Sequence, residues 1–116
     1  FQGPIGGEID DNNPPMISIR HYPLNPTAAQ NVTFTAFASD LSGISRIEMF
    51  VDNVNVKICR RELCNYVGGP YKYGSIHTYY ATARANDGGF GRDPANGTKN
   101  FTVTGINPIP VSGATS

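Results

Sequence analysis

The chain has 116 residues, with nine acidic and nine basic side chains, and charged residues make up only 16% of it. This length suits one domain that buries its own hydrophobic core. The charges form no basic stripe of the kind typical of nucleic-acid-binding proteins, and no apolar run approaches the ~20 residues of a membrane span. We therefore predict neither nucleic acid nor a membrane span for this segment.

Residues 1–15 show no hydrophobic periodicity. Phe1-Gln2-Gly3 resembles the remnant of a cleavable tag and is left out of the fold argument. The rest is dense in Gly, Pro, Asp and Asn, which predicts an incoming linker that stiffens toward Pro14-Pro15. Residues 105–116 are rich in Pro, Gly and Ser and are predicted to be an outgoing linker. One domain, residues 16–104, is expected between the two.

The first predicted strand covers residues 16–22, with Ile17 and Ile19 on one face. Pro15 and Pro23 flank it, and proline cannot donate to a sheet ladder. We therefore expect an edge strand.

The clearest pattern runs from Asn31 to Asp52 and predicts two strands joined through residues 40–43. In the first strand, alternate positions form one apolar face: Val32, Phe34, Ala36 and Ala38. In the second, the apolar face is Ile47, Met49 and Val51. This two-residue period is typical of strands with one buried face, and the β-branched and aromatic content argues against a helix.

The second half of the chain continues with shorter strands. Asp52-Asn53 predicts a hairpin turn, after which residues 54–59 alternate as the partner strand. Residues 65–73 hold a short strand at most. Residues 76–86 form the second strong strand, and one face of it carries His77, Tyr79, Ala81, Ala83 and Ala85.

The last part of the predicted domain is a loop and a strand. Residues 87–97 are rich in Gly, with Pro and Asn, and predict a long loop. Residues 98–104 predict the last strand, with Phe101 and Val103 facing inward. About seven short strands separated by turn signals favour an antiparallel β-sandwich, with a β-barrel as the alternative. The expected core includes Phe34, Met49, Tyr79 and Phe101.

Three segments resemble the immunoglobulin-like modules found in tandem in bacterial and archaeal surface proteins. They are residues 11–17 (DNNPPMI), residues 38–52 (ASDLSGISRIEMFVD) and residues 79–87 (YYATARAND). The resemblance implies an all-β, antiparallel immunoglobulin-like sandwich of about seven strands. It also implies a non-enzymatic, extracellular role, in which the module is a spacer, stalk or adhesion domain whose partners are neighbouring modules of the same chain.

Cys59 and Cys64 are separated by four residues. A redox pair or half of a metal site is one interpretation, but zinc would need two more ligands, and His21 and His77 lie in separate predicted strands. We predict a structural disulfide that staples a hairpin and contributes roughly 2 kcal/mol in the chain-entropy model. A disulfide and the polar, charge-poor composition both favour an exported protein.

Nothing in the sequence predicts an enzyme. Nucleophilic catalysis needs a nucleophile, a base and an orienting group. No Gly-Xaa-Ser-Xaa-Gly motif occurs, and neither histidine lies in a catalytic motif. His77 opens a strand and is expected at the surface.

Four carboxylates form a candidate calcium site: Asp10, Asp11, Asp40 and Asp87. In a sandwich with this strand order, the turn at Asp40 and the loop at Asp87 project from the end where the incoming linker arrives. Hard cations prefer several such oxygen ligands, and the linker resembles a cadherin-type junction. The alternative is that Asp40 caps its own turn and the linker is simply solvated.

Four tyrosines form a candidate ligand face: Tyr66, Tyr71, Tyr73 and Tyr80. Together with the loop of residues 87–97, they could bind carbohydrate or protein, which is the alternative function. Scattered surface tyrosines are the other interpretation. The spacer role is preferred because the spacing shows no convergent set of aromatic and polar residues. No cofactor other than possible calcium is predicted.

Overall fold

The computed structural model describes residues 13–104, which contain eight strands and no helix. One sheet has the order β1-β2-β5, formed by β1 (Met16–Tyr22), β2 (Val32–Ser39) and β5 (Leu63–Gly68). The facing sheet is formed by β3 (Ile44–Val51), β4 (Val54–Cys59), β6 (Ile76–Ala85), β7 (Phe90–Asp93) and β8 (Lys99–Thr102).

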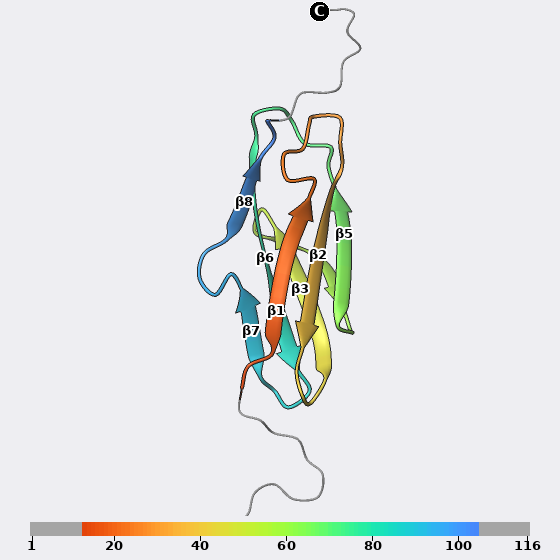
Figure 1. The fold of residues 1–116 in the computed structure, drawn as a ribbon, viewed down its shortest axis with the longest axis vertical. Helices are drawn as coiled ribbons and strands as arrows, with labels where there is room; N and C mark the ends of the chain where they lie inside the picture. Colours follow the sequence, from red (N-terminus) through yellow and green to blue (C-terminus); the bar gives the residue numbers. More distant parts are fainter. Residues whose placement is uncertain (1–12, 105–116) are drawn as a thin grey trace, which may run out of the picture.

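The two sheets pack face to face as a sandwich (Figure 1). In the five-stranded sheet the order is β4-β3-β6, and β7 and β8 share the far side of β6, each pairing with one half of it. All pairings are antiparallel, and the chain crosses between sheets after β2, β4 and β5. This confirms the predicted all-β, antiparallel sandwich, with eight strands where about seven were expected.

The core lies between the inward faces of the two sheets. All four predicted core side chains are buried: Phe34, Met49, Tyr79 and Phe101. The ring of Phe34 lies 5.2 Å from that of Tyr79 and 5.9 Å from that of Phe101, centroid to centroid. The apolar residues that alternate along the predicted strands are therefore the residues that form the core.

Strand β7 corrects the prediction of one long loop over residues 87–97. Its outward residue Phe90 is 49% exposed, whereas its inward residues are Gly91 and Asp93. A Cβ on Gly91 would lie 2.6 Å from the carbonyl oxygen of Pro15, so only glycine permits this approach of the first strand. The strand has no inward apolar side chain and therefore no apolar alternation in its sequence.

The Cys59–Cys64 disulfide is present, with 5.6 Å between the Cα atoms. It does not staple a hairpin, because β4 and β5 lie at the edges of different sheets. The bridge therefore ties the two sheets together along one side of the sandwich. The hairpin turn predicted at Asp52-Asn53 is confirmed, since the φ angles of these residues, 52° and 66°, are those of a tight turn between β3 and β4.

The opposite side of the sandwich is closed by an ion pair. Asp93 and Lys99 lie 2.9 Å apart, and both also contact the backbone of Ile19 in β1. Strand β1 pairs only with β2, as expected for an edge strand. We use the name Ile19 clamp for this contact, which consists of the Asp93 and Lys99 side chains and the Ile19 backbone.

The described chain begins and finishes at opposite ends of the sandwich (Figure 1). We call the end that holds Asn13 to Pro15 the incoming end and the end that follows β8 the outgoing end. Between residues 13 and 104 there is no helix long and apolar enough to span a membrane.

Candidate functional site

Three segments meet at the incoming end: Asn13 to Pro15, the turn between β2 and β3, and the turn between β6 and β7. The Asn86 side chain donates to the carbonyl oxygen of Ser42 at 2.8 Å, which joins the two turns. A Cβ on Gly89 would lie 3.4 Å from the carbonyl oxygen of Asn13. The turns that carry Asp40 and Asp87 are therefore neighbours, as their place in the strand order predicts.

The carboxylates of Asp40 and Asp87 are each bound within their own turns. Asp40 accepts hydrogen bonds from the Ser42 backbone at 3.0 Å and from the Ser42 hydroxyl at 2.8 Å. Asp87 accepts one from the Gly89 backbone at 2.9 Å, and its own N–H donates to Ser42 Oγ at 3.1 Å. The bonds of Asp40 are the turn-capping bonds of the alternative interpretation.

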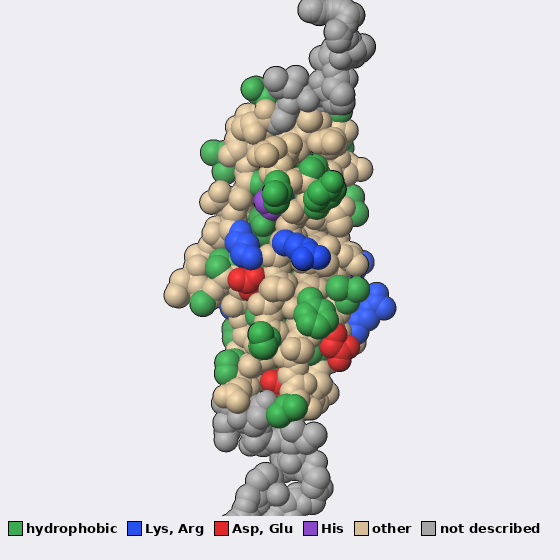
Figure 2. Space-filling model, viewed as in Figure 1, with side chains coloured by type: hydrophobic (Ala, Val, Ile, Leu, Met, Phe, Trp, Pro, Cys, Tyr) green, Lys and Arg blue, Asp and Glu red, His purple; other side chains and the backbone are tan. Residues whose placement is uncertain are grey.

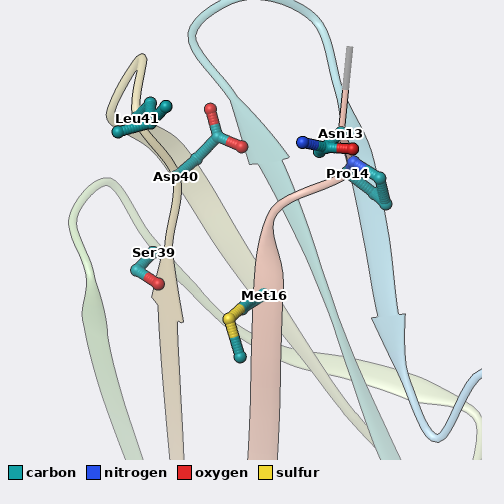
Figure 3. A pocket seen from close by; sticks show the side chains of 6 residues that line it. All are labelled: Asn13, Pro14, Met16, Ser39, Asp40 and Leu41. Carbon is teal, nitrogen blue, oxygen red and sulfur yellow. The ribbon is translucent and has the colours of Figure 1, made fainter. Parts of the chain in front are cut away.

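An open cleft of about 440 Å³ separates the β2–β3 turn from the incoming segment (Figure 3). Its lining residues are Asn13, Pro14, Met16, Ser39, Asp40 and Leu41. Asp40 is the single carboxylate among them. Within residues 13–104, no three His, Cys, Asp or Glu side chains form a group that could hold a metal ion. Asp10 and Asp11 lie outside the described residues, so the four-carboxylate calcium site stays a prediction.

The four candidate tyrosines do not share one surface. Tyr66 and Tyr71 are partly buried against the core, and Tyr73 is 63% exposed in the segment after β5. Tyr80 lies on the outer face of the five-stranded sheet, opposite Phe50 in the register. The structure therefore brings together Tyr66 and Tyr71, which flank Gly68, and leaves Tyr80 apart.

Both ring faces of Tyr80 are already covered. The ring of Phe50 stacks on it at 4.5 Å with 6° between the planes, and the guanidinium of Arg92 lies 4.1 Å from the ring centroid. Because β6 lies between β3 and β7, these two neighbours approach from opposite sides. A sugar ring has no open face on which to stack here.

A constellation that sequence reasoning missed lies near the outgoing end. The Nδ1 atom of His77 is 2.7 Å from Asp52 Oδ2, and its Nε2 atom is 2.8 Å from Ser75 Oγ. This is the connectivity of a Ser-His-Asp triad. His77 is not a surface residue as expected, since its side chain is only 15% exposed and its ring lies 4.0 Å from that of Tyr71.

The surroundings of this trio favour a structural role. The Ser75 hydroxyl also donates to the carbonyl oxygen of Lys72. The neighbouring N–H groups are already used as donors: Gly74 to Val103, Ser75 to Lys72, and Thr78 to Asp52. An oxyanion would need two unoccupied donors aimed at one point. The trio instead connects the β3–β4 turn to the segment before β6.

Burial raises two tyrosine pKa values near the core. The pKa of Tyr79 is raised to about 12 by burial and, to a lesser degree, by the negative charge of Asp93. The Tyr79 hydroxyl lies 2.7 Å from Nδ1 of His21, whose Nε2 faces the carbonyl oxygen of Leu24. Since a carbonyl only accepts, Nε2 carries the hydrogen of the neutral ring and Tyr79 donates to Nδ1. The pKa of Tyr71 is also raised, mainly by burial and to a lesser degree by electrostatic interaction with Tyr66 and Asp52.

The outer face of the three-stranded sheet is less organised. Apolar side chains appear on it as separate patches among polar surface (Figure 2). On this face, Phe37 is 52% exposed and Val67 is 55% exposed. The exposed cation that β1 contributes to the same face is Arg20.

No protein-family model matches this chain, and no curated protein matches it significantly. The likeness to immunoglobulin-like surface modules therefore stays a resemblance in sequence.

Proposed function

We propose that this chain is a non-enzymatic, immunoglobulin-like module that acts as a spacer or stalk in an extracellular multidomain protein. The observation that carries the proposal is the exit of the described chain from opposite ends of the sandwich (Figure 1). A domain with this arrangement extends a string of modules by its full length. Its natural partners would be the neighbouring modules of the same chain.

The Ile19 clamp supports a role in resisting mechanical tension. It links the first strand to the last, because Lys99 of β8 donates to the Ile19 carbonyl at 2.6 Å and Asp93 accepts from the Ile19 N–H at 2.8 Å. Tension between the two ends would pull β1 and β8 in opposite directions along their axes. The clamp and the ladder between β1 and β2 would then be loaded in shear, so their bonds would have to break together.

The disulfide supports an oxidising compartment. Small domains with a disulfide are typical of secreted and cell-surface proteins, whereas cytosolic thiols are kept reduced. The Cys59–Cys64 bridge ties the sheets at the side opposite the clamp, so both open sides of the sandwich are held. Both links would help an extracellular stalk to keep its two sheets together under tension.

The binding alternative has less support from the geometry. The tyrosines expected to form a ligand face are divided between the core and two separate surfaces. Adhesion through another surface remains part of the proposed role.

Single-molecule force spectroscopy tests the proposal. The full chain is stretched through its two ends between marker domains, and a second sample is stretched between position 53 and the C-terminal end. We expect a clearly higher unfolding force through the two ends, because the second geometry peels the hairpin between β3 and β4 one bond at a time. Equal unfolding forces in the two pulling geometries would contradict a module that resists tension between its ends. A glycan-array screen of the same protein, with reproducible hits lost in Tyr71→Ala or Tyr73→Ala, would favour the binding role instead.

A further inference from the structure

The outer face of the five-stranded sheet has an excess of positive charge. The outward-facing charged side chains of β3, β6 and β7 are Arg46, Glu48, Arg84 and Arg92. The single carboxylate, Glu48, is paired with Arg46 at 2.7 Å. Neither Arg84 nor Arg92 has a carboxylate partner among residues 13–104.

Both arginines are held in fixed positions. The guanidinium of Arg92 lies over Tyr80 and donates to the carbonyl oxygen of Pro94 at 2.9 Å. That of Arg84 lies 5.0 Å from the Phe90 centroid and donates to the Gly88 carbonyl at 3.3 Å. Each guanidinium has further N–H donors in its planar fork. Arginines fixed in this way bind carboxylates with little loss of conformational entropy.

The described residue Asn13, which follows an acidic segment in the sequence, lies near Arg84. Arg84 contacts Gly88, and the next residue, Gly89, lies against the backbone of Asn13. The residues upstream include Glu8, Asp10 and Asp11. They are two to five positions before Asn13, a reach of at most roughly 18 Å for an extended chain.

We propose that the acidic segment Glu8–Asp11 docks on the surface formed by Arg84 and Arg92. The nearest alternative position is the incoming end itself, where the carboxylates of Asp40 and Asp87 repel further negative charge. The docked segment would fix the direction in which the chain approaches the domain. This inference concerns the chain alone and does not depend on the spacer role. It is also distinct from the calcium prediction, which gathers the same carboxylates at Asp40 and Asp87.

Paramagnetic relaxation in the full chain tests the docking. Because Cys59 and Cys64 are bonded to each other, a single added cysteine, Gly7→Cys, accepts a spin label under non-reducing conditions. At low salt we expect strong broadening of the Phe90 and Arg92 amide signals. We expect at least a twofold smaller relaxation effect in Arg84→Gln/Arg92→Gln and at about 1 M salt, where the Debye length is ~3 Å.

Two controls make the result decisive. Arg20→Gln removes one cation from the outer face of the other sheet and should leave the relaxation pattern unchanged. A tenfold dilution should also change nothing, because the contact is within one chain. The proposal is wrong if the broadening is the same in the double variant, or if it centres on the turns of Asp40 and Asp87. Loss of broadening on dilution would also overturn it and would assign the contact to a second copy.

Discussion

Lys99 and Asp93 form an ion pair whose two charged groups also bind the backbone of the same residue in the facing sheet. Lys99 donates to the Ile19 carbonyl and Asp93 accepts from the Ile19 N–H. Ile19 is 1% exposed and lies on an edge strand, so these two groups have no ladder partner on that side. The ion pair therefore supplies bonds that a neighbouring strand would otherwise make. It also blocks this part of the edge from pairing with another chain.

The first prediction concerns this clamp. Lys99→Met removes the donor to Ile19 and leaves Asp93 without its cation, so the free energy of unfolding should fall by about 1–3 kcal/mol. Urea denaturation measures the change. Asp93→Asn alone and the double variant complete a cycle, and we expect the two effects to be clearly non-additive because the side chains share one site.

The matched control for the clamp is the pair of Arg46 and Glu48. These side chains are 38% and 26% exposed and lie 2.7 Å apart, but they bind no backbone group across the sandwich. Glu48→Gln should cost less than about 1 kcal/mol, as for other surface pairs. An equal cost at both pairs would show that the contact with Ile19 contributes nothing.

The second prediction compares two phenylalanines of β2. Phe34 is fully buried and Phe37 is 52% exposed on the opposite face. Phe34→Ala should lower the free energy of unfolding by about 3–5 kcal/mol through lost burial and the cavity left behind. Phe37→Ala should change it by about 0.5 kcal/mol or less. Chemical denaturation of both variants decides the matter, and similar losses would mean that the predicted faces of this strand are wrong.

The sequence predicts the fold where apolar residues alternate. Phe34, Met49 and Phe101 lie in such patterns, and all three are in the core. It misses β7 because the inward residues there are Gly91, which packs by having no side chain, and the charged Asp93. Alternation of apolar residues reports which face of a strand is buried, and a strand without an inward apolar side chain leaves no such signal.

Contacts between strands that are distant in the sequence could not be predicted in the same way. The spacing of Cys59 and Cys64 fits a hairpin as well as a link between two sheets, and only the pairing of β4 and β5 with other strands decides between them. The contact of His77 with Asp52 likewise depends on the register of β3 and β6. The contact between Ser75 and His77 could have been predicted from the sequence, because residues two apart in an extended segment point to the same side.

The third prediction concerns the disulfide. Replacing both cysteines with serine should lower the free energy of unfolding by about 2 kcal/mol in the chain-entropy model for so small a loop. The far-ultraviolet spectrum should remain that of a β-protein, since the larger core side chains such as Phe34 and Met49 are unchanged. Alkylation without reductant, followed by mass spectrometry, checks the starting material. Two alkylated thiols in protein purified under oxidising conditions would refute the bond.

The fourth prediction concerns alkaline pH. The pKa of Tyr79 is raised from 10.0 to about 12 in the folded protein, so folding favours the protonated phenol. The resulting stabilisation is complete below pH 10 and is lost as pH rises toward 12. Urea denaturation on either side of pH 10 should show the decline, and tyrosinate absorbance should follow it.

Tyr79→Phe provides the control for the alkaline effect. This variant removes the titrating hydroxyl, so part of the decline in stability above pH 10 should disappear. It should also be less stable at neutral pH, because Nδ1 of His21 loses its donor. An unchanged alkaline slope would mean that the Tyr79 hydroxyl does not cause the decline.

The last prediction concerns calcium at the incoming end. If Asp10, Asp11, Asp40 and Asp87 converge there, a cation would relieve their mutual repulsion and stabilise the fold, by about 2.7 kcal/mol at a hundredfold excess over Kd. Thermal melts in millimolar calcium and in chelator measure this shift. The capping bonds of Asp40 require a careful variant, because Asp40→Ala would remove them as well as the charge. Asp40→Asn keeps an acceptor oxygen for Ser42, so it should retain most of the stability in chelator while losing the calcium increment. A wild-type midpoint that does not move with calcium would end the calcium hypothesis and leave Asp40 as a turn cap.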